Sequence, residues 1–273
     1  LNQLRHIPCD DDCRMRVDLL AEEIRQDRAN GLNPFCVVGS AGTVTTGAID
    51  RLDELADLCT RENLWFHVDG AFGALAALSE RQRDRLLPAG RADSLSLDPH
   101  KMLFTSLEAG CVLFRRAADM RSTYSFVPTY LSMVSDPDFV DYAEYGPQLS
   151  RSFKAFKVWW SLRAYGRRAY ERTIDNLFDL AAYMGERISS APELELMAPV
   201  NFNAVCVRCS DLDDTQNERL LARLVSGGKA FLGRASVKGR FCLRACFMNL
   251  RTTRADVDII IDELITLSQS EQR

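Results

Sequence analysis

The order of apolar runs along residues 17–116 constrains the fold of this chain more than any other feature. Stretches with helical spacing, such as 48–63 and 79–87, alternate with short apolar runs that are rich in β-branched or aromatic residues, such as 34–40 and 64–71. Short apolar runs of this kind are typical of strands that are buried on both faces. The alternation therefore predicts an α/β layer with a mainly parallel sheet.

The second half of the chain has a different pattern. Residues 124–150 contain three prolines without sustained periodicity, and we expect a mobile loop there, because segments of this kind are usually functional or disordered. A strongly helical stretch follows and breaks near Gly166, and the remainder alternates strand and helix up to an amphipathic helix at 254–269. The sequence predicts two units, part of a large α/β domain over 1–156 and a smaller α/β domain over 157–273.

Composition excludes several classes of function. The 273 residues are 47% apolar and 26% charged, which is ordinary for a globular protein. The 34 basic and 38 acidic residues give a net charge of −4, so no nucleic-acid surface is expected. No apolar run reaches the roughly 18 residues of a membrane span, and no signal peptide opens the chain, so we expect a cytoplasmic protein.

Nine cysteines are scattered through apolar segments, which is typical of reduced, buried thiols. Two close pairs, Cys206 with Cys209 and Cys242 with Cys246, could in principle bind zinc. Both segments are predicted as strands, however, and in a strand Cys206 and Cys209 point to opposite faces. The pattern therefore disfavours zinc, and no metal is expected.

The glycine-rich stretch "GSAGTVTTG" (39–47) lies between a predicted strand and a predicted helix. The spacing of Gly42 and Gly47 fits half of a P-loop, but Ala48-Ile49 stands where that motif requires Lys-Ser/Thr. The stretch therefore remains a turn with hydroxyl groups that could approach a small ligand. Asp50 is predicted to cap the helix that follows.

An aspartate and a lysine follow two neighbouring predicted strands. Asp69 ends the strand at 64–71, where open α/β sheets bind ligands, although a lone aspartate could equally cap the next segment. His67 faces the same side as Asp69 and is either a hydrogen-bonding neighbour or a satisfied core histidine. Lys101 follows the next strand, 92–98. An amine and a carboxylate at adjacent strand ends suit pyridoxal phosphate, which needs an imine to lysine and a protonated pyridine nitrogen.

These motifs, "HVDGA" (67–71) and "DPHK" (98–101) with "AGTVTTGAID" (41–50) upstream, resemble the group II pyridoxal-phosphate-dependent amino-acid decarboxylases. The resemblance covers nearly the whole chain and implies the fold type I architecture of pyridoxal-phosphate-dependent transferases. It implies that Lys101 holds the cofactor and that Asp69 pairs with the pyridine nitrogen. It further implies that His100 lies near the phosphate, that Ala71 packs against the ring, and that Thr43 contacts the cofactor.

The resemblance also assigns a catalytic residue in the long loop. Tyr130 matches a loop tyrosine that is taken to protonate the substrate carbon after CO2 leaves, and Arg151 matches an arginine whose role is left open. Three positions depart from the family pattern: Val44 replaces a threonine, Gly70 replaces an alanine, and Asp98 stands where relatives often have asparagine. None of these departures removes a catalytic group.

Family members are much longer than this chain, which starts at Leu1 without an initiator methionine. In the family, the preceding segment carries a histidine that stacks on the cofactor, most of the phosphate-binding loop and much of the dimer interface. We therefore expect a C-terminal portion of a homodimeric enzyme, whose site the preceding segment completes.

The expected reaction is decarboxylation of an L-amino acid to an amine and CO2. The stretches "FVPTYL" (126–131) and "LSRSFKAFKVWW" (149–160) resemble the aromatic-amino-acid branch and favour an aromatic substrate. One alternative is an aldehyde synthase on the same scaffold, in which phenylalanine commonly replaces the loop tyrosine, so that Tyr130 favours decarboxylation. The other is a non-catalytic or truncated paralogue that only binds a partner chain.

Overall fold

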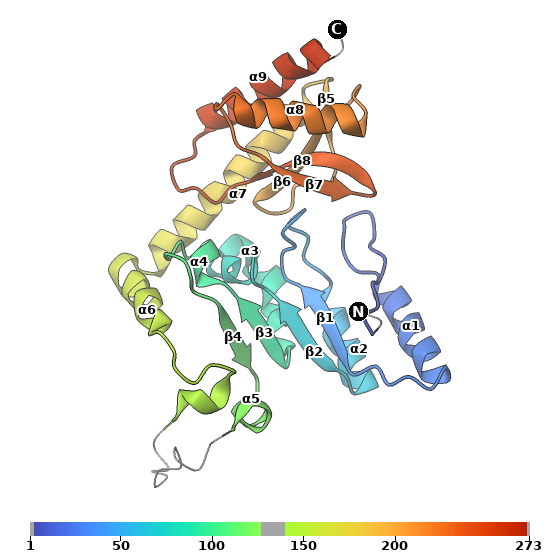
Figure 1. Ribbon diagram of the computed structural model, residues 1–273, viewed down its shortest axis with the longest axis vertical. Helices are drawn as coiled ribbons and strands as arrows, with labels where there is room; N and C mark the ends of the chain where they lie inside the picture. Colours follow the sequence, from blue (N-terminus) through green and yellow to red (C-terminus); the bar gives the residue numbers. More distant parts are fainter. Residues whose placement is uncertain (1–2, 127–139, 272–273) are drawn as a thin grey trace.

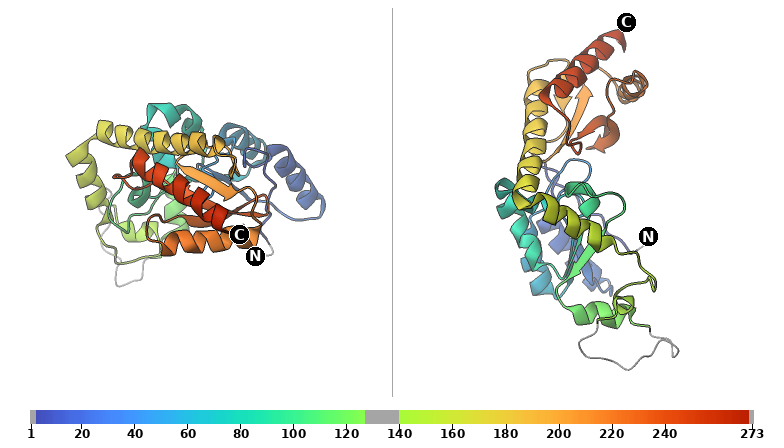
Figure 2. Two further views of the ribbon diagram at one scale, coloured as in Figure 1. Left: turned by 90° about the horizontal axis from the view of Figure 1, so that it is seen from above. Right: turned by 90° about the vertical axis from the view of Figure 1, so that its left-hand side faces the viewer.

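The computed structural model describes residues 3–126 and 140–271 and consists of two units, each built on a four-stranded sheet (Figure 1). The units are stacked along the long axis of the molecule, and the two views in Figure 2 show helices packed beside both sheets. Among the described residues, no helix is long and apolar enough to cross a bilayer.

The first sheet has the order β1-β2-β3-β4. Strands β1 to β3 are parallel, and β4 pairs with β3 in the antiparallel sense, so the predicted α/β layer with a mainly parallel sheet is confirmed. The strands are β1 (Cys36–Ser40), β2 (Trp65–Asp69), β3 (Ser94–Leu97) and β4 (Cys111–Phe114). The helices of this part are α1 (Val17–Ala29), α2 (Leu52–Glu62), α3 (Glu80–Leu86), α4 (Pro99–Met102) and α5 (Ala117–Tyr124), with short 3-10 turns η1 (Ala74–Leu78), η2 (Leu87–Arg91) and η4 (Tyr142–Tyr145).

The two faces of this sheet are covered differently. Val37, Phe66 and Val68 point toward a core that α2 completes with leucines at helical spacing, including Leu52 and Leu55. Successive residues of a strand point to opposite faces, so the neighbouring side chains of the same strands share the other face. We call this second side the open face, and its members include Val38, Ser40, Trp65, His67, Asp69, Ser94 and Ser96.

Asp50 does not cap α2, which begins at Leu52 with Arg51 in the capping position. Its carboxylate is buried instead: Oδ1 accepts a hydrogen bond from the Met15 amide at 2.7 Å and Oδ2 accepts one from the Ser40 amide at 2.8 Å. Burial raises the pKa of Asp50 above its ordinary value, and the two amide donors lower it in part. Asp50 thus fastens the N-terminal segment to β1.

The second unit contains an antiparallel sheet of order β5-β6-β8-β7. Its strands are β5 (Leu194–Leu196), β6 (Ala204–Cys209), β7 (Gly233–Val237) and β8 (Arg240–Cys246). Its helices are α6 (Lys154–Tyr165), α7 (Arg167–Ser189), α8 (Asp214–Ser226) and α9 (Arg254–Glu271). The predicted helix break near Gly166 and the predicted final helix are therefore confirmed. The division at residue 157 falls inside α6 and stays a prediction.

Strand β6 is buried at every position. Cys209 belongs to the core formed with α7, α8 and α9, whereas Cys206 lies in a separate cluster with Cys242. The prediction that Cys206 and Cys209 point to opposite faces is confirmed. Among the described residues, no group of three or more His, Cys, Asp or Glu side chains could hold a metal ion.

Contacts between the units centre on Phe202, which precedes β6. Its ring lies 5.8 Å from the ring of Phe72 in the first unit and 4.8 Å from that of Phe178 on α7, measured between centroids. The loop after β1 adds a hydrogen bond, because the Cys206 thiol donates to the Thr45 carbonyl at 3.2 Å. The second unit thus packs directly against the loop that follows β1.

Candidate active site

The carboxyl ends of β1, β2 and β3 meet at one edge of the first sheet. Ser40 pairs with Asp69 across β1 and β2, and Asp69 pairs with Ser96 across β2 and β3. Because the three strands are parallel, the segments that follow them leave from the same edge. Those segments carry Thr43 after β1 and Lys101 after β3, so the fold brings the residues predicted from sequence to this edge.

Asp69 presents one carboxylate oxygen that is oriented and one that is free. Its Oδ1 accepts hydrogen bonds from the Ala71 amide at 3.1 Å and from the Ser96 hydroxyl at 3.2 Å. Oδ2 has no partner within the described part of the chain, and the residue is exposed. Asp69 can therefore accept a hydrogen bond from a ligand N–H while Ala71 and Ser96 hold its orientation.

Lys101 lies in α4, a single helical turn that follows β3. Pro99 starts this turn, where its fixed φ suits the first helical position and its missing N–H costs nothing. The Lys101 Nζ atom lies 2.9 Å from Asp98 Oδ2, and the lysine side chain is 34% exposed. The amine is thus accessible, and an ion pair with Asp98 holds it at the strand end.

His100 precedes Lys101 in the same turn. Its Nδ1 lies 2.8 Å from the carbonyl oxygen and 3.1 Å from the amide nitrogen of Ala109, and its Nε2 lies 3.7 Å from Asp98 Oδ2. The segment 103–110 therefore fixes the imidazole beside Lys101.

The Thr43 hydroxyl is already engaged in its own loop. Its Oγ1 lies 3.0 Å from the Thr46 hydroxyl oxygen and accepts a hydrogen bond from the Ala48 amide at 3.2 Å. The Val44 carbonyl of the same loop accepts a hydrogen bond from Arg244 of β8. The loop is thus fastened both internally and to the second unit.

The sequence identified Lys101, Asp69, Ala71, His100 and Thr43, which all lie at this edge, whereas Tyr130 lies outside the described residues. It missed the groups that orient them. Ser96 and Asp98 are among these, and a signal for Ser96 was present in the alternation of "SLSLD", which places Ser96 on the face of Asp69. The contact of His100 with Ala109 carried no sequence signal.

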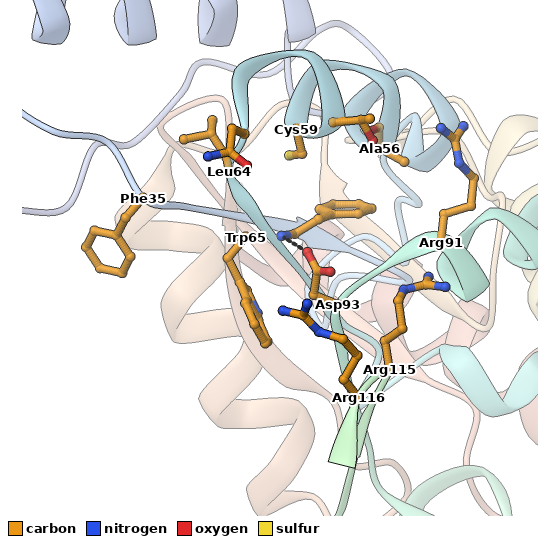
Figure 3. Close-up of a pocket in the computed structure, with 12 residues that line it drawn as sticks. Phe35, Ala56, Cys59, Leu64, Trp65, Arg91, Asp93, Arg115 and Arg116 are labelled. Atoms are coloured by element: carbon orange, nitrogen blue, oxygen red, sulfur yellow. Dashed lines mark hydrogen bonds between the residues drawn. The ribbon is translucent and has the colours of Figure 1, made fainter. Parts of the chain in front are cut away.

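A cavity of about 670 Å³ lies at the opposite edge of the sheet (Figure 3). Its walls include Trp65 at the start of β2 and three arginines that are already bonded: Arg91 to Asp57 at 2.5 Å, Arg115 to the Gly90 carbonyl at 2.6 Å and Arg116 to Asp119 at 2.8 Å. Lys101 and Asp69 lie at the other edge, so this cavity is not the candidate active site.

The groups at the site fit pyridoxal phosphate by their chemistry. An accessible primary amine can bond an aldehyde carbon, and a carboxylate with a free oxygen can hold a proton on a pyridine nitrogen. Lys101 and Asp69 supply these two groups from adjacent strands. The fold and this pair of groups are those of an α/β protein suited to a carbonyl cofactor.

Comparison with known proteins names the family. Residues 1–210 match the pyridoxal-dependent decarboxylase conserved domain, and the chain belongs to this family. It is 36% identical over 277 residues to the aromatic-L-amino-acid decarboxylase of Bacillus atrophaeus, covering 98% of this chain and 58% of that protein.

Solved structures agree with this assignment. Oryza sativa TDC with PLP and tryptamine has a TM-score of 0.93 and 26% identity, over 100% of this chain and 58% of that one. Rhodiola rosea 4-hydroxyphenylacetaldehyde synthase has a TM-score of 0.89 and 25% identity, over 98% of this chain and 57% of that one. The family, the fold class and the cofactor expected from the sequence are therefore confirmed, and the chain spans somewhat more than half the length of these relatives.

Proposed function

We propose that the protein containing this chain is a pyridoxal-phosphate-dependent decarboxylase that converts an L-amino acid, preferably an aromatic one, to its amine and CO2. The observation that carries the proposal is that the free Oδ2 of Asp69 and the accessible Lys101 side chain lie at the same edge of the sheet, at or just after the ends of adjacent parallel strands. Membership in the decarboxylase family supports the reaction class. The aromatic preference is supported by the relative that is 36% identical.

The proposed roles follow from the geometry of each side chain. When bound, pyridoxal phosphate supplies an electron sink for the bond between Cα and the carboxylate. Lys101 would hold the cofactor through its side-chain amine. Asp69 keeps a proton on the pyridine nitrogen, because a nearby negative charge stabilises the protonated form. The Ala71 amide and the Ser96 hydroxyl hold the carboxylate in position.

The remaining roles in the proposal are positional. In the proposal, His100 contacts the cofactor phosphate, as its place directly before Lys101 in the family motif implies, while Thr43 and Ala71 border the cofactor from the loops after β1 and β2. Tyr130 returns a proton to Cα after CO2 leaves. Asp98 binds the Lys101 ammonium whenever that amine is not bonded to the cofactor.

The experiment that tests cofactor capture uses borohydride reduction. Incubation with pyridoxal phosphate followed by borohydride is expected to leave a stable adduct on Lys101, located by peptide mass spectrometry. K101A is expected to carry none, whereas K229A is expected to label normally, because Lys229 is paired with Glu263 in the second unit. A folded wild-type protein without an adduct would instead support the rival proposal of a non-catalytic paralogue.

A second candidate function is aldehyde synthesis, which the similarity to the Rhodiola rosea 4-hydroxyphenylacetaldehyde synthase favours. Tyr130 argues for decarboxylation, because a phenolic proton donor at the substrate carbon quenches the negative charge that would otherwise react with oxygen. The complete protein, given aromatic L-amino acids in air, is expected to release amine without aldehyde or ammonia. Predominant aldehyde would reverse the choice.

The proposal extends to assembly, compartment and domain division. Phe156, Trp159 and Trp160 of α6 are exposed at 48%, 53% and 61% and contact one another through their rings, and a cluster of exposed aromatic rings favours an interface, here that of a homodimer. All nine cysteines lie in the described residues as free thiols, which suits the reducing cytoplasm. The large domain ends near residue 156 and the small domain follows. Sedimentation at several concentrations tests the dimer.

A further inference from the structure

His67 is the candidate from the sequence that the proposed reaction leaves without a role. It lies in the middle of β2 on the open face, two residues before Asp69, and is half-buried. Val38 of β1 and Ser94 of β3 are its neighbours in the sheet register. Asp69 is the charged group that acts on its imidazole among the described residues.

Two hydrogen bonds meet at the Ser94 hydroxyl. Trp65 Nε1 lies 2.9 Å from Ser94 Oγ, and His67 Nδ1 lies 2.7 Å from the same oxygen. The indole N–H can only donate, so Ser94 Oγ accepts from Trp65. Figure 3 shows Trp65 pointing away from Ala56 and Cys59 of α2, which agrees with its place on the open face.

The direction of the second bond follows from the single proton on the Ser94 hydroxyl. Ser94 is 5% exposed, and among the described residues its hydroxyl makes no hydrogen bond other than these two. If His67 Nδ1 carried a proton, the hydroxyl proton would be buried without an acceptor, which costs about 1–3 kcal/mol. Ser94 therefore donates to a bare Nδ1, and the imidazole proton resides on Nε2.

The same surroundings keep the imidazole neutral. Burial lowers the pKa of His67, and this effect is larger than the opposing influence of the Asp69 charge. A hydroxyl that donates to Nδ1 also stabilises the neutral ring, because protonation of Nδ1 would break that bond. The Trp65 ring also packs against the Phe114 ring, with 6.2 Å between the ring centroids. This contact fixes the indole whose N–H donates to Ser94.

The state of His67 matters for Asp69. An imidazolium on the same face, two residues away, would attract the free Oδ2 that the cofactor's ring nitrogen requires. We propose that Trp65, Ser94 and His67 form a positioning relay that holds His67 as the neutral Nε2–H tautomer and so reserves the Asp69 carboxylate for the cofactor. This inference rests on the proposed function, because it assigns Asp69 to the pyridine nitrogen.

Nitrogen NMR tests the relay without cofactor. The 273-residue chain has three histidines, so its imidazole spectrum is simple. His67 is expected to show a bare Nδ1 and a protonated Nε2, and to be less protonated at pH 6.5 than a free imidazole, which is half protonated there. In S94A the bare Nδ1 signal is expected to weaken and His67 to titrate at higher pH.

Ser40→Ala is the matched control, because Ser40 lies on the open face beside Asp69 in the register, whereas the hydrogen bond of the His67 ring is to Ser94. Its His67 spectrum is expected to equal that of the wild type. A wild-type His67 that carries its proton on Nδ1, or an S94A spectrum identical to the wild-type one, would overturn the relay.

Cofactor affinity of the complete protein gives the second readout. Between pH 8 and pH 6, S94A is expected to lose about 3–10-fold more affinity for pyridoxal phosphate than wild type loses. The reason is that His67 in S94A becomes charged at the lower pH. H67Q, which is neutral at all pH values, is expected to show no such pH-dependent loss. Equal weakening of S94A at both pH values would overturn the role assigned to the relay. If wild type bound no cofactor, the proposed function would fail while the NMR result stood.

Discussion

The two sheets of this molecule differ in how completely their faces are buried. In the second unit, β6 is buried at all six positions, with Cys209 on one side and Cys206 on the other. In the first unit, β2 alternates between buried residues on the core face and partly exposed residues on the open face, ending with Asp69 exposed. The second sheet thus serves as a core, whereas the first presents polar side chains on one face.

This difference shows where the chain places its chemistry. A strand that is packed on both faces, as β6 is, favours apolar residues and thiols, because unpaired polar groups are costly there, and its one charged residue, Arg208, is paired with Asp214 at 2.7 Å. The open face instead carries hydroxyls, an imidazole and a carboxylate that bond one another, as in the contact of Asp69 with Ser96. The candidate active site lies on the side of the first sheet that does not pack against the core.

The largest expected effect compares a leucine in each sheet. Leu243 of β8 is fully buried, whereas Leu113 of the edge strand β4 is 51% exposed. L243A is expected to lower the free energy of unfolding by about 2–5 kcal/mol, because it removes methyl groups and leaves a cavity. L113A should change it by no more than about 1 kcal/mol. Urea titration measures both, and equal losses would contradict the contrast between the sheets.

The next prediction concerns the junction between the units. Gly47 has a φ of +73°, and a Cβ at this position would lie 2.3 Å from Phe202 Cβ. G47A is expected to lower the free energy of unfolding by about 2–4 kcal/mol through backbone strain and displacement of Phe202. The control is G31A, at a φ of +79° with open space around it, which should cost about 1 kcal/mol. Similar losses in thermal or urea unfolding would mean that the Phe202 contact adds little.

The smallest expected effect tests the buried carboxylate of the first unit. D50N is expected to lower the free energy of unfolding by about 1–3 kcal/mol. The asparagine side chain has one oxygen in place of two, so it cannot accept the hydrogen bonds of both the Met15 and the Ser40 backbone N–H groups. D57N, which alters the exposed ion pair with Arg91, should change stability by less than about 1 kcal/mol.

The Asp50 carboxylate also predicts a pH dependence. Its pKa in the folded protein is raised above the ordinary value of 3.8, so the folded state binds more protons between the two values. Its contribution to stability is therefore largest below the unfolded pKa and falls as the pH rises through the folded one. Subtracting the D50N stability curve from that of wild type isolates this slope, and a difference that rises with pH would contradict it.

The sequence predicted the fold well where periodicity carries the signal. The alternation of strands and helices, the break at Gly166 and the edge that holds Asp69 and Lys101 all follow from spacing and strand order. It failed at Asp50, where residue type alone suggested a helix cap. The structure uses that carboxylate for the Met15 amide, a contact across 35 positions of sequence that no local pattern encodes.

The same limit explains what was missing from the candidate site. The bond from Trp65 to Ser94 joins different strands, and it depends on a register that the sequence does not state. His67 was identified, but whether it was a satisfied core histidine or a neighbour of Asp69 could not be decided without that register. The structure shows that it is bonded to Ser94 and lies on the face of Asp69.

The helix α7 contributes to the cores of both units, and this affects how the protein unfolds. Ile174 and Phe178 on this helix belong to the core of the first unit, while Leu177 and Leu180 belong to that of the second. The same helix therefore cannot be lost from one unit without exposing apolar surface of the other. We therefore expect the two units to unfold together, so that a core substitution in either unit lowers the population of the whole native state.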